Sequence, residues 1–411
     1  MSVQRAFFAI LVGGLVLTLL TIARAQVDSR RIEEVVKKNV LTPEDMEIID
    51  AFVTDAVGRL VRTTDFTEVA KNRAVIVSHQ ISQAQYAQRF SDAALREIGK
   101  GFEYATNEIT DPDRRFKVFT NLLILASELN DPRLLELGIR MIPDENAMVR
   151  YWAVRVATNP SVWAKLGQDQ NTAAALSRRI VDACGKVVET SSPEVLYLMA
   201  QFAARYDTAP APDLLTRIAD VRIKRYADWA VKYELVDTGI LKLLSAKIIS
   251  GGAANQQLAR QFSQLYSYAI QRYIRSLKDN NLRELSGSYL ASVLVEAEQQ
   301  CLSKLLNAPQ TSITRAVEAG DAGALQAEHD RLLGTANQAG ALPSKFNFTY
   351  GSAPEKRSAP LALPEPPQRK AAVGTKLPET KLPETKLPEA KPPESKPPEP
   401  KPAEPKPPAK P

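Results

Sequence analysis

Residues 144–153 have the sequence Asp-Glu-Asn-Ala-Met-Val-Arg-Tyr-Trp-Ala, and this stretch decides the fold. Val149 and Ala153 begin an apolar stripe that Val156 and Ala157 continue. Apolar residues at intervals of three and four lie on one face of an α-helix. The stretch therefore predicts a short helix that packs through a single face.

The same spacing of apolar residues extends from Leu41 to about Leu342, with few alternating β-branched residues, and it predicts an all-α protein. Helix starts punctuate the chain, each with a capping residue and, in three cases, proline at the first helical position. They lie at Thr42-Pro43-Glu44-Asp45, Asp65-Phe66-Thr67-Glu68, Asp111-Pro112 and Asp131-Pro132. Short helices that pack by one face and are joined by short loops fold as stacked antiparallel helices.

The stretch 144–153 resembles the second-helix motif of HEAT-type repeats. The resemblance implies that the polar residues cap the helix, that Val149 and Ala153 pack on a partner helix, and that Arg150 lies along the ridge between repeats. A weaker match follows at Pro193-Glu194-Val195, where Leu196 replaces the arginine. The expected architecture is an irregular, HEAT-like array of stacked antiparallel helices. A non-repeating α-helical domain remains the alternative.

Composition divides the chain into four regions. We expect a signal peptide at 1–25, a region of short helices at 26–210, a subdomain of longer helices at 211–351 that ends in an extended segment, and a disordered tail at 352–411. The second boundary follows Pro210 and Pro212, after which 213–235, 255–278 and 286–306 each have the pattern of one long helix.

The N-terminus has the features of a secretory signal. Arg5 precedes an apolar stretch from Ala6 to Ala23, and Ala23-Arg24-Ala25 is a small-x-small cleavage site. We expect cleavage after Ala25 and a secreted or periplasmic protein, with an uncleaved anchor as the alternative. No later segment is apolar for long enough to span a membrane.

The C-terminus repeats in units of five from Lys376 onward, as KLPET, KLPET, KLPEA, KPPES, KPPEP, KPAEP and KPPAK before Pro411. Proline in every unit prevents helix and sheet, and the Lys and Glu residues between the prolines offer little to bury. The pattern predicts an extended polyproline II spacer.

The net charge of +6 does not indicate nucleic-acid binding. The signal carries two basic residues and the region 352–411 carries a net +4, so the remainder is +6 − 2 − 4 = 0.

Cys184 and Cys301 each lie on an apolar stripe, which favours two buried thiols, with a disulfide as the alternative. The Cys and His residues show no ligand spacing, so neither a metal nor a cofactor is expected.

No catalytic motif is found. His79 and His329 are interpreted as solvated histidines on polar helix faces. The candidate partner surface comprises Arg222, Arg225, Trp229 and Tyr233, although a solvated face for the arginines and core packing for Trp229 are the ordinary interpretations. We expect a binding or scaffolding protein whose partner is a protein or a cell-envelope component. An envelope-polysaccharide enzyme with paired carboxylates and a structural envelope protein are the alternatives.

Overall fold

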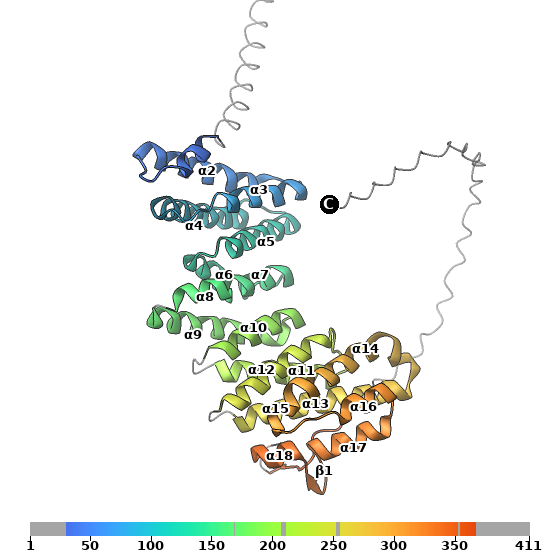
Figure 1. Cartoon of the computed structure of the whole chain (residues 1–411). Helices are drawn as coiled ribbons and strands as arrows, with labels where there is room; N and C mark the ends of the chain where they lie inside the picture. Colours follow the sequence, from blue (N-terminus) through green and yellow to red (C-terminus); the bar gives the residue numbers. More distant parts are fainter. Residues whose placement is uncertain (1–29, 168, 207–210, 252–254, 352–353, 367–411) are drawn as a thin grey trace, which may run out of the picture. The chain divides into compact units, whose positions relative to one another are not determined.

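The computed structural model describes residues 30–167, 169–206, 211–251, 255–351 and 354–366. The described chain is all-α, which confirms the predicted class (Figure 1). The one sheet in the described ranges is an antiparallel hairpin of β1 (Gly334–Thr335) and β2 (Gln338–Ala339). The predicted signal peptide and the pentapeptide repeats lie outside the described residues. Among the described residues, no helix is both long and apolar enough to cross a bilayer.

The first half has short helices but also four of 18–24 residues, so the predicted change from short to longer helices is not found in the part of the chain that the structure describes. The helices of this half are α2 (Pro43–Arg62), α3 (Phe66–Ser78), α4 (Ala84–Asn107), α5 (Pro112–Leu129), α6 (Leu135–Met141), α7 (Ala147–Ala157), α8 (Pro160–Leu166), α9 (Gln170–Val187) and α10 (Pro193–Arg205), with 3₁₀ turns at η1 (Pro132–Leu134) and η2 (Val188–Thr190). Those that follow are α11 (Ala211–Ala227), α12 (Leu235–Ser250), α13 (Asn255–Lys278), α14 (Asn280–Ala297), α15 (Ser303–Leu306), α16 (Ser312–Ala319), α17 (Ala322–Leu333) and α18 (Ala341–Phe346).

Contacts between the helices follow the order of the chain. Helices α3, α5, α7, α10, α12 and α14 form one row in which each contacts the next, and α9, α11 and α13 form part of a second row. Figure 1 shows α3, α5, α7 and α10 stacked on one side of the array. Within pairs, α2 contacts α3, α6 contacts α7 and α11 contacts α12. Most contacts thus join helices that are close in the sequence or that follow each other along a row.

The predicted helix starts are confirmed by their hydrogen bonds. Thr42 caps α2 in a reciprocal capping box with Asp45, and Asp65 and Asp111 accept hydrogen bonds from the first turns of α3 and α5. Asp131 caps η1, so the short 3₁₀ turn precedes α6. The bonds of Lys38 and Thr42 to the carboxylate lower the pKa of Asp45 to about 2.

The stretch 144–153 has the geometry that its pattern predicts. Asn146 caps α7 by accepting from the backbone of Met148 and Val149, while Val149 and Ala153 are fully buried. The Arg150 side chain donates to the carbonyl of Asp144 and to the carbonyl and hydroxyl of Thr190, in the loop before α10. This arginine therefore joins two consecutive helical pairs.

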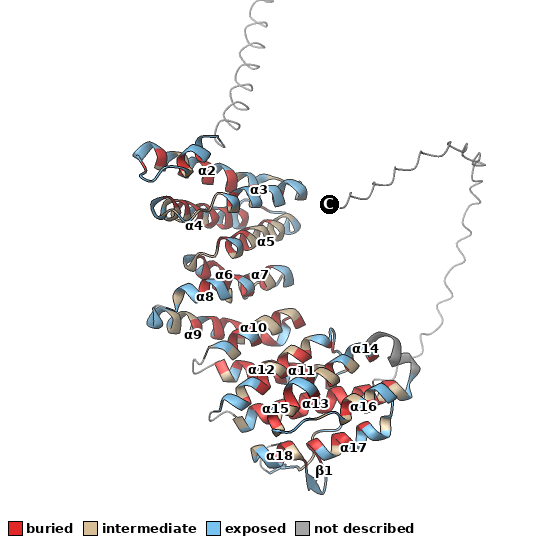
Figure 2. Cartoon of the chain, in the orientation of Figure 1, coloured by how far each residue is buried: buried red, intermediate tan, exposed pale blue. Residues whose placement is uncertain are grey.

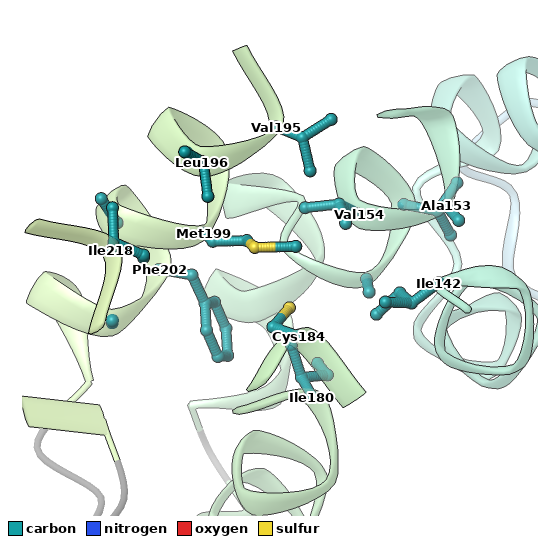
Figure 3. Packing of buried hydrophobic residues seen from close by; sticks show 14 of the residues in the cluster. Ile142, Ala153, Val154, Ile180, Cys184, Val195, Leu196, Met199, Phe202 and Ile218 are labelled. Carbon is teal, nitrogen blue, oxygen red and sulfur yellow. The ribbon is translucent and has the colours of Figure 1, made fainter. Parts of the chain in front are cut away.

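The buried apolar residues form one cluster that extends from Ile32 to Leu363, and buried positions occur on helices throughout the described chain (Figure 2). Figure 3 shows Met199 of α10 between Val154 of α7 and Cys184 of α9, with Phe202 beside them. Cys184 and Cys301 are free and buried, so the alternative of a disulfide is excluded. Burial raises the pKa of Cys184 to about 12 and that of Cys301 to about 11, which makes both thiols poor nucleophiles at neutral pH.

The long helices of the second half are confirmed only in part. The predicted bounds 255–278 are those of α13, and the predicted helix ending at Leu306 is instead three consecutive segments: α14, a π-helical turn at Glu298–Leu302 and α15. The helix predicted for 213–235 is wrong, because α11 ends at Ala227 and α12 begins at Leu235. Trp229 and Tyr233 both have positive φ angles and lie in the turn between these helices.

Candidate binding surfaces

Arg222 was predicted to be part of a partner surface, and the structure shows that it is not. Its side chain is fully buried and forms a bidentate ion pair with the equally buried Asp237 of α12, at 2.6 and 2.8 Å. The Tyr226 hydroxyl donates to the same carboxylate. Burial alone would lower the pKa of Arg222, but the charge of Asp237 outweighs it and raises this pKa. Nothing in the sequence indicated that Asp237 would pair with Arg222. The pattern around Arg222 therefore indicated an arginine on a solvent-exposed helix face.

The buried ion pair fixes the turn between α11 and α12. Arg222 also donates to the carbonyl of Lys232, the residue before Tyr233. On the other side of the turn, Arg272 of α13 pairs with the buried Glu234 at 3.5 Å. These contacts hold the left-handed backbone at Tyr233, a conformation that disfavours a bulky residue. The turn therefore presents Tyr233 on a rigid support.

Arg225 is the second predicted surface residue, and it lies at the edge of the loop before α10. It donates to the carbonyls of Glu189 and Ser191, while Arg150 reaches the carbonyl of Thr190 from α7. Two arginines, one from α7 and one from α11, thus order the same short loop.

An open hollow of about 770 Å³ lies beside this loop, and we call it the Tyr233 hollow. The Tyr233 side chain is 63% exposed and Met148, at the start of α7, is 52% exposed. The full lining is Ala147, Met148, Tyr151, Thr190, Ser191, Ser192, Pro193, Glu194, Arg225, Ala230, Lys232 and Tyr233. The structure therefore brings Arg225 and Tyr233 to one surface, together with Met148 and Tyr151, which the sequence analysis did not select.

Trp229, the fourth predicted residue, lies on a different surface. Its ring contacts the guanidinium groups of Arg272 and Arg275, at 5.3 and 5.6 Å from the ring centroid. Its indole N–H donates to the carbonyl of Pro364. Trp229 thus contacts the chain's own C-terminal region rather than lying in the Tyr233 hollow.

The region predicted to be a solvated tail from Ser352 begins later than expected. Tyr350 and Arg357 form an antiparallel bridge, and residues up to Pro366 belong to the first compact unit of the chain. Leu363 is 2% exposed, so an apolar side chain of the presumed tail is buried. Leucine at positions 361 and 363 was the signal in the sequence that this segment can pack on the helices.

Polar side chains of α13 hold this segment through its backbone. Gln264 donates to the carbonyl of Leu361 and accepts from its N–H, at 3.3 and 2.8 Å. Gln271 donates to the same carbonyl and accepts from the N–H of Leu363, at 3.1 and 2.7 Å. Arg275 donates to the carbonyls of Leu363 and Pro364, at 2.7 and 2.8 Å, and pairs with Glu365 at 3.1 Å. We call this surface, formed by Gln264, Gln271, Arg275 and Trp229, the α13 face.

Beneath the α13 face, Ser267, His329 and Asp330 have the connectivity of a hydrolase triad. The Ser267 hydroxyl is 2.9 Å from Nε2 of His329, and Nδ1 is 3.0 Å from Asp330. However, Ser267 is fully buried and its hydroxyl also accepts from Gln271. It lies within α13, where neighbouring N–H groups are used by the helix and cannot form an oxyanion hole.

The prediction of a solvated His329 is therefore wrong. The imidazole is buried, and burial lowers its pKa despite the opposing effect of Asp330. Its role in the structure is to support Ser267, which orients Gln271 on the α13 face. His79 follows the last residue of α3 and is half-buried, with its ring 4.7 Å from that of Phe52.

A second aromatic hollow, of about 630 Å³, lies between the ends of α5, α7 and α10. Trp152 is half-buried in its wall, with the Arg155 guanidinium 5.3 Å from the indole centroid. The lining includes Glu128 as its one carboxylate. A hollow between α9 and α11 has two carboxylates, Asp182 and Asp213, but no aromatic residue.

Within the described ranges, no group of three or more Cys, His, Asp and Glu residues is placed to hold a metal ion. No family model, curated protein or solved structure matches this chain.

Proposed function

We propose that this chain is an exported helical-repeat protein that binds a partner, as a scaffold or adaptor, at the Tyr233 hollow. The architecture of the proposal is a HEAT-like α-solenoid. It is supported by the two rows of helices and by Arg150, which joins two consecutive pairs. In such a solenoid, successive pairs present one extended surface and need no cofactor.

The observation that carries the proposal is the pair of exposed apolar side chains on a rigid wall. Tyr233 and Met148 are both more than half exposed. The turn that holds Tyr233 is fixed from below by the Arg222–Asp237 ion pair. Aromatic residues on a preorganised surface are typical of binding hot spots, because little conformational entropy is lost on binding. Methionine is also enriched at protein interfaces.

Charge at the hollow indicates the chemistry of the partner. Arg225 and Lys232 supply two positive charges, against one negative charge from Glu194. A protein segment that carries an apolar side chain beside a carboxylate would complement this lining. The hollow is therefore proposed to bind a partner protein of the cell envelope.

The location follows from the N-terminal sequence. Arg5, the apolar stretch and Ala23-Arg24-Ala25 support export, with the mature chain beginning at Gln26. The pentapeptide repeats then form an extended spacer that follows the helical unit. N-terminal sequencing of the exported chain tests this assignment, and an intact Met1 contradicts it.

The alternative of a polysaccharide enzyme has weaker support. Such an enzyme needs a pair of carboxylates in a cleft with aromatic residues that stack on sugar rings. Here the aromatic hollow at Trp152 and the carboxylates Asp182 and Asp213 lie in different places.

The test is affinity capture from a crosslinked envelope fraction with the full chain as bait. We expect Tyr233→Ala and Lys232→Glu to lower the recovery of the specific partner by at least tenfold. Arg178→Glu on α9 is the matched control, because Arg178 is exposed but does not line the Tyr233 hollow. Equal recovery with all three variants would contradict the proposed site.

A further inference from the structure

The segment on the α13 face is recognised by a small number of features. Leu363 contributes a buried side chain, an N–H that donates to Gln271 and a carbonyl that accepts from Arg275. Pro364 contributes its carbonyl to Arg275 and Trp229. Glu365 contributes a carboxylate to Arg275. The specific part of the ligand is therefore Leu-Pro-Glu.

The two residues before this tripeptide are recognised differently. Leu361 is bonded through its backbone N–H and carbonyl, while its side chain is 40% exposed. Ala362 is exposed. Any residue with a backbone N–H satisfies the first position, and a long polar side chain fits the second.

Leu-Pro-Glu occurs three more times in the chain, at 377–379, 382–384 and 387–389. Threonine stands two residues before each of these leucines, at the position of Leu361, and it has the backbone N–H that can donate a hydrogen bond to Gln264. Lysine stands directly before each leucine, at the position that Ala362 leaves in solvent. These repeats therefore meet every requirement of the α13 face.

The later repeats do not. Pro392, Pro397 and Pro402 stand where the leucine would be. Proline has neither the N–H that Gln271 requires nor the leucine side chain that is buried. The repeats at 376–390 can therefore bind the α13 face and those at 391–405 cannot, although both sets carry lysine and glutamate at the same spacing.

We propose that the α13 face is a Leu-Pro-Glu binding site and that the repeats at 377–389 of the same chain exchange with 363–365 on it. A repeat of the same chain is favoured over a free ligand because it is tethered and so present at a high effective concentration. The entropic cost of closing a loop grows only with the logarithm of its length, so repeats further along the tail can also reach the α13 face. Docking at Glu389 leaves 411 − 389 = 22 residues beyond the site, against 411 − 365 = 46 with Glu365 docked. Exchange therefore sets the length of the free spacer.

The first test uses the full chain with all four leucines, Leu363, Leu377, Leu382 and Leu387, replaced by aspartate, so that no internal ligand competes. The probe is a fluorescein-labelled synthetic peptide with the sequence of residues 375–389, followed by anisotropy. The control peptide has the sequence of 391–405, with the same length and the same three lysines and three glutamates. We expect at least tenfold tighter binding of the first peptide, and loss of that difference with Arg275→Glu. Equal binding of the two peptides would overturn the proposal.

The second test needs no substitution in the site. Millisecond hydrogen exchange on a full chain with aspartate at Leu363, Leu382 and Leu387, in which 377–379 is the one remaining Leu-Pro-Glu, should show at least threefold slower exchange of amides in 375–379 than in a chain that carries aspartate at Leu377 as well. Since the exchanging repeats belong to the same chain, this protection should not depend on protein concentration. Protection that grows with concentration, or none at all, would contradict the proposal.

Discussion

Asp237→Asn tests the buried support of the Tyr233 hollow. The substitution keeps the shape of the side chain but removes the charge that Arg222 faces at 2.6 and 2.8 Å, where both side chains are fully buried. An uncompensated charge in such a position costs about 3–5 kcal/mol. The expected result is a loss of that size in the free energy of unfolding, measured by urea denaturation.

A surface ion pair of similar length provides the control. Lys242 and Glu296 are 2.8 Å apart and their side chains are 37% and 42% exposed, so Glu296→Gln should cost less than about 1 kcal/mol. The double substitution Arg222→Met with Asp237→Leu should recover much of the loss, because no buried charge remains. A loss below about 1 kcal/mol for Asp237→Asn would refute the reasoning that this ion pair fixes the turn.

Three further predictions concern stability and are checked by urea denaturation. Deletion of 367–411 should change the free energy of unfolding by less than about 0.5 kcal/mol. Deletion of 352–411 should cost about 1.5–3 kcal/mol, because the buried side chain of Leu363 is lost. Equal denaturation midpoints for the two deletions would contradict the packing of this segment on α13. Because burial lowers the pKa of His329, the unfolded state binds more protons below about pH 6.5, so stability should fall from pH 7.5 to pH 5.5 and fall less in His329→Gln. Trp152→Ala should cost about 1–3 kcal/mol, less than a fully buried tryptophan would, because its ring lines an open hollow.

Local patterns predicted the helices well because their causes are local. Thr42, Asp65 and Asp111 cap helices through bonds to residues two or three positions away, so the chemistry lies within a few residues of sequence. Apolar spacing likewise identified α13 with its correct bounds. These features depend on periodicity and capping, which sequence contains directly.

The errors arose where a distant residue decides the outcome. Arg222 has a helical neighbourhood that fits a solvated face, and only the fold brings Asp237 to it. No glycine or proline marks the end of α11 at Ala227, so the turn at Trp229 was not predicted. His329 is buried because α17 packs on α13, a contact between helices far apart in sequence.

The α13 face was missed for a related reason. Gln264, Gln271 and Arg275 are spaced by seven and four residues, which places them on one face of the helix. This polar row was a signal, but the segment that it binds lies about ninety residues away in a region of unusual composition. Leu363 within that region was the complementary signal.

The most direct test of the binding account is site-specific photocrosslinking in the cell. A photoreactive phenylalanine analogue at Met148 lies in the Tyr233 hollow, and the same analogue at Arg178 is exposed on α9 outside that lining. The account predicts a discrete crosslinked partner from position 148 that Lys232→Glu removes, and none from position 178. The absence of a product at position 148, or the same product at both positions, would contradict the account.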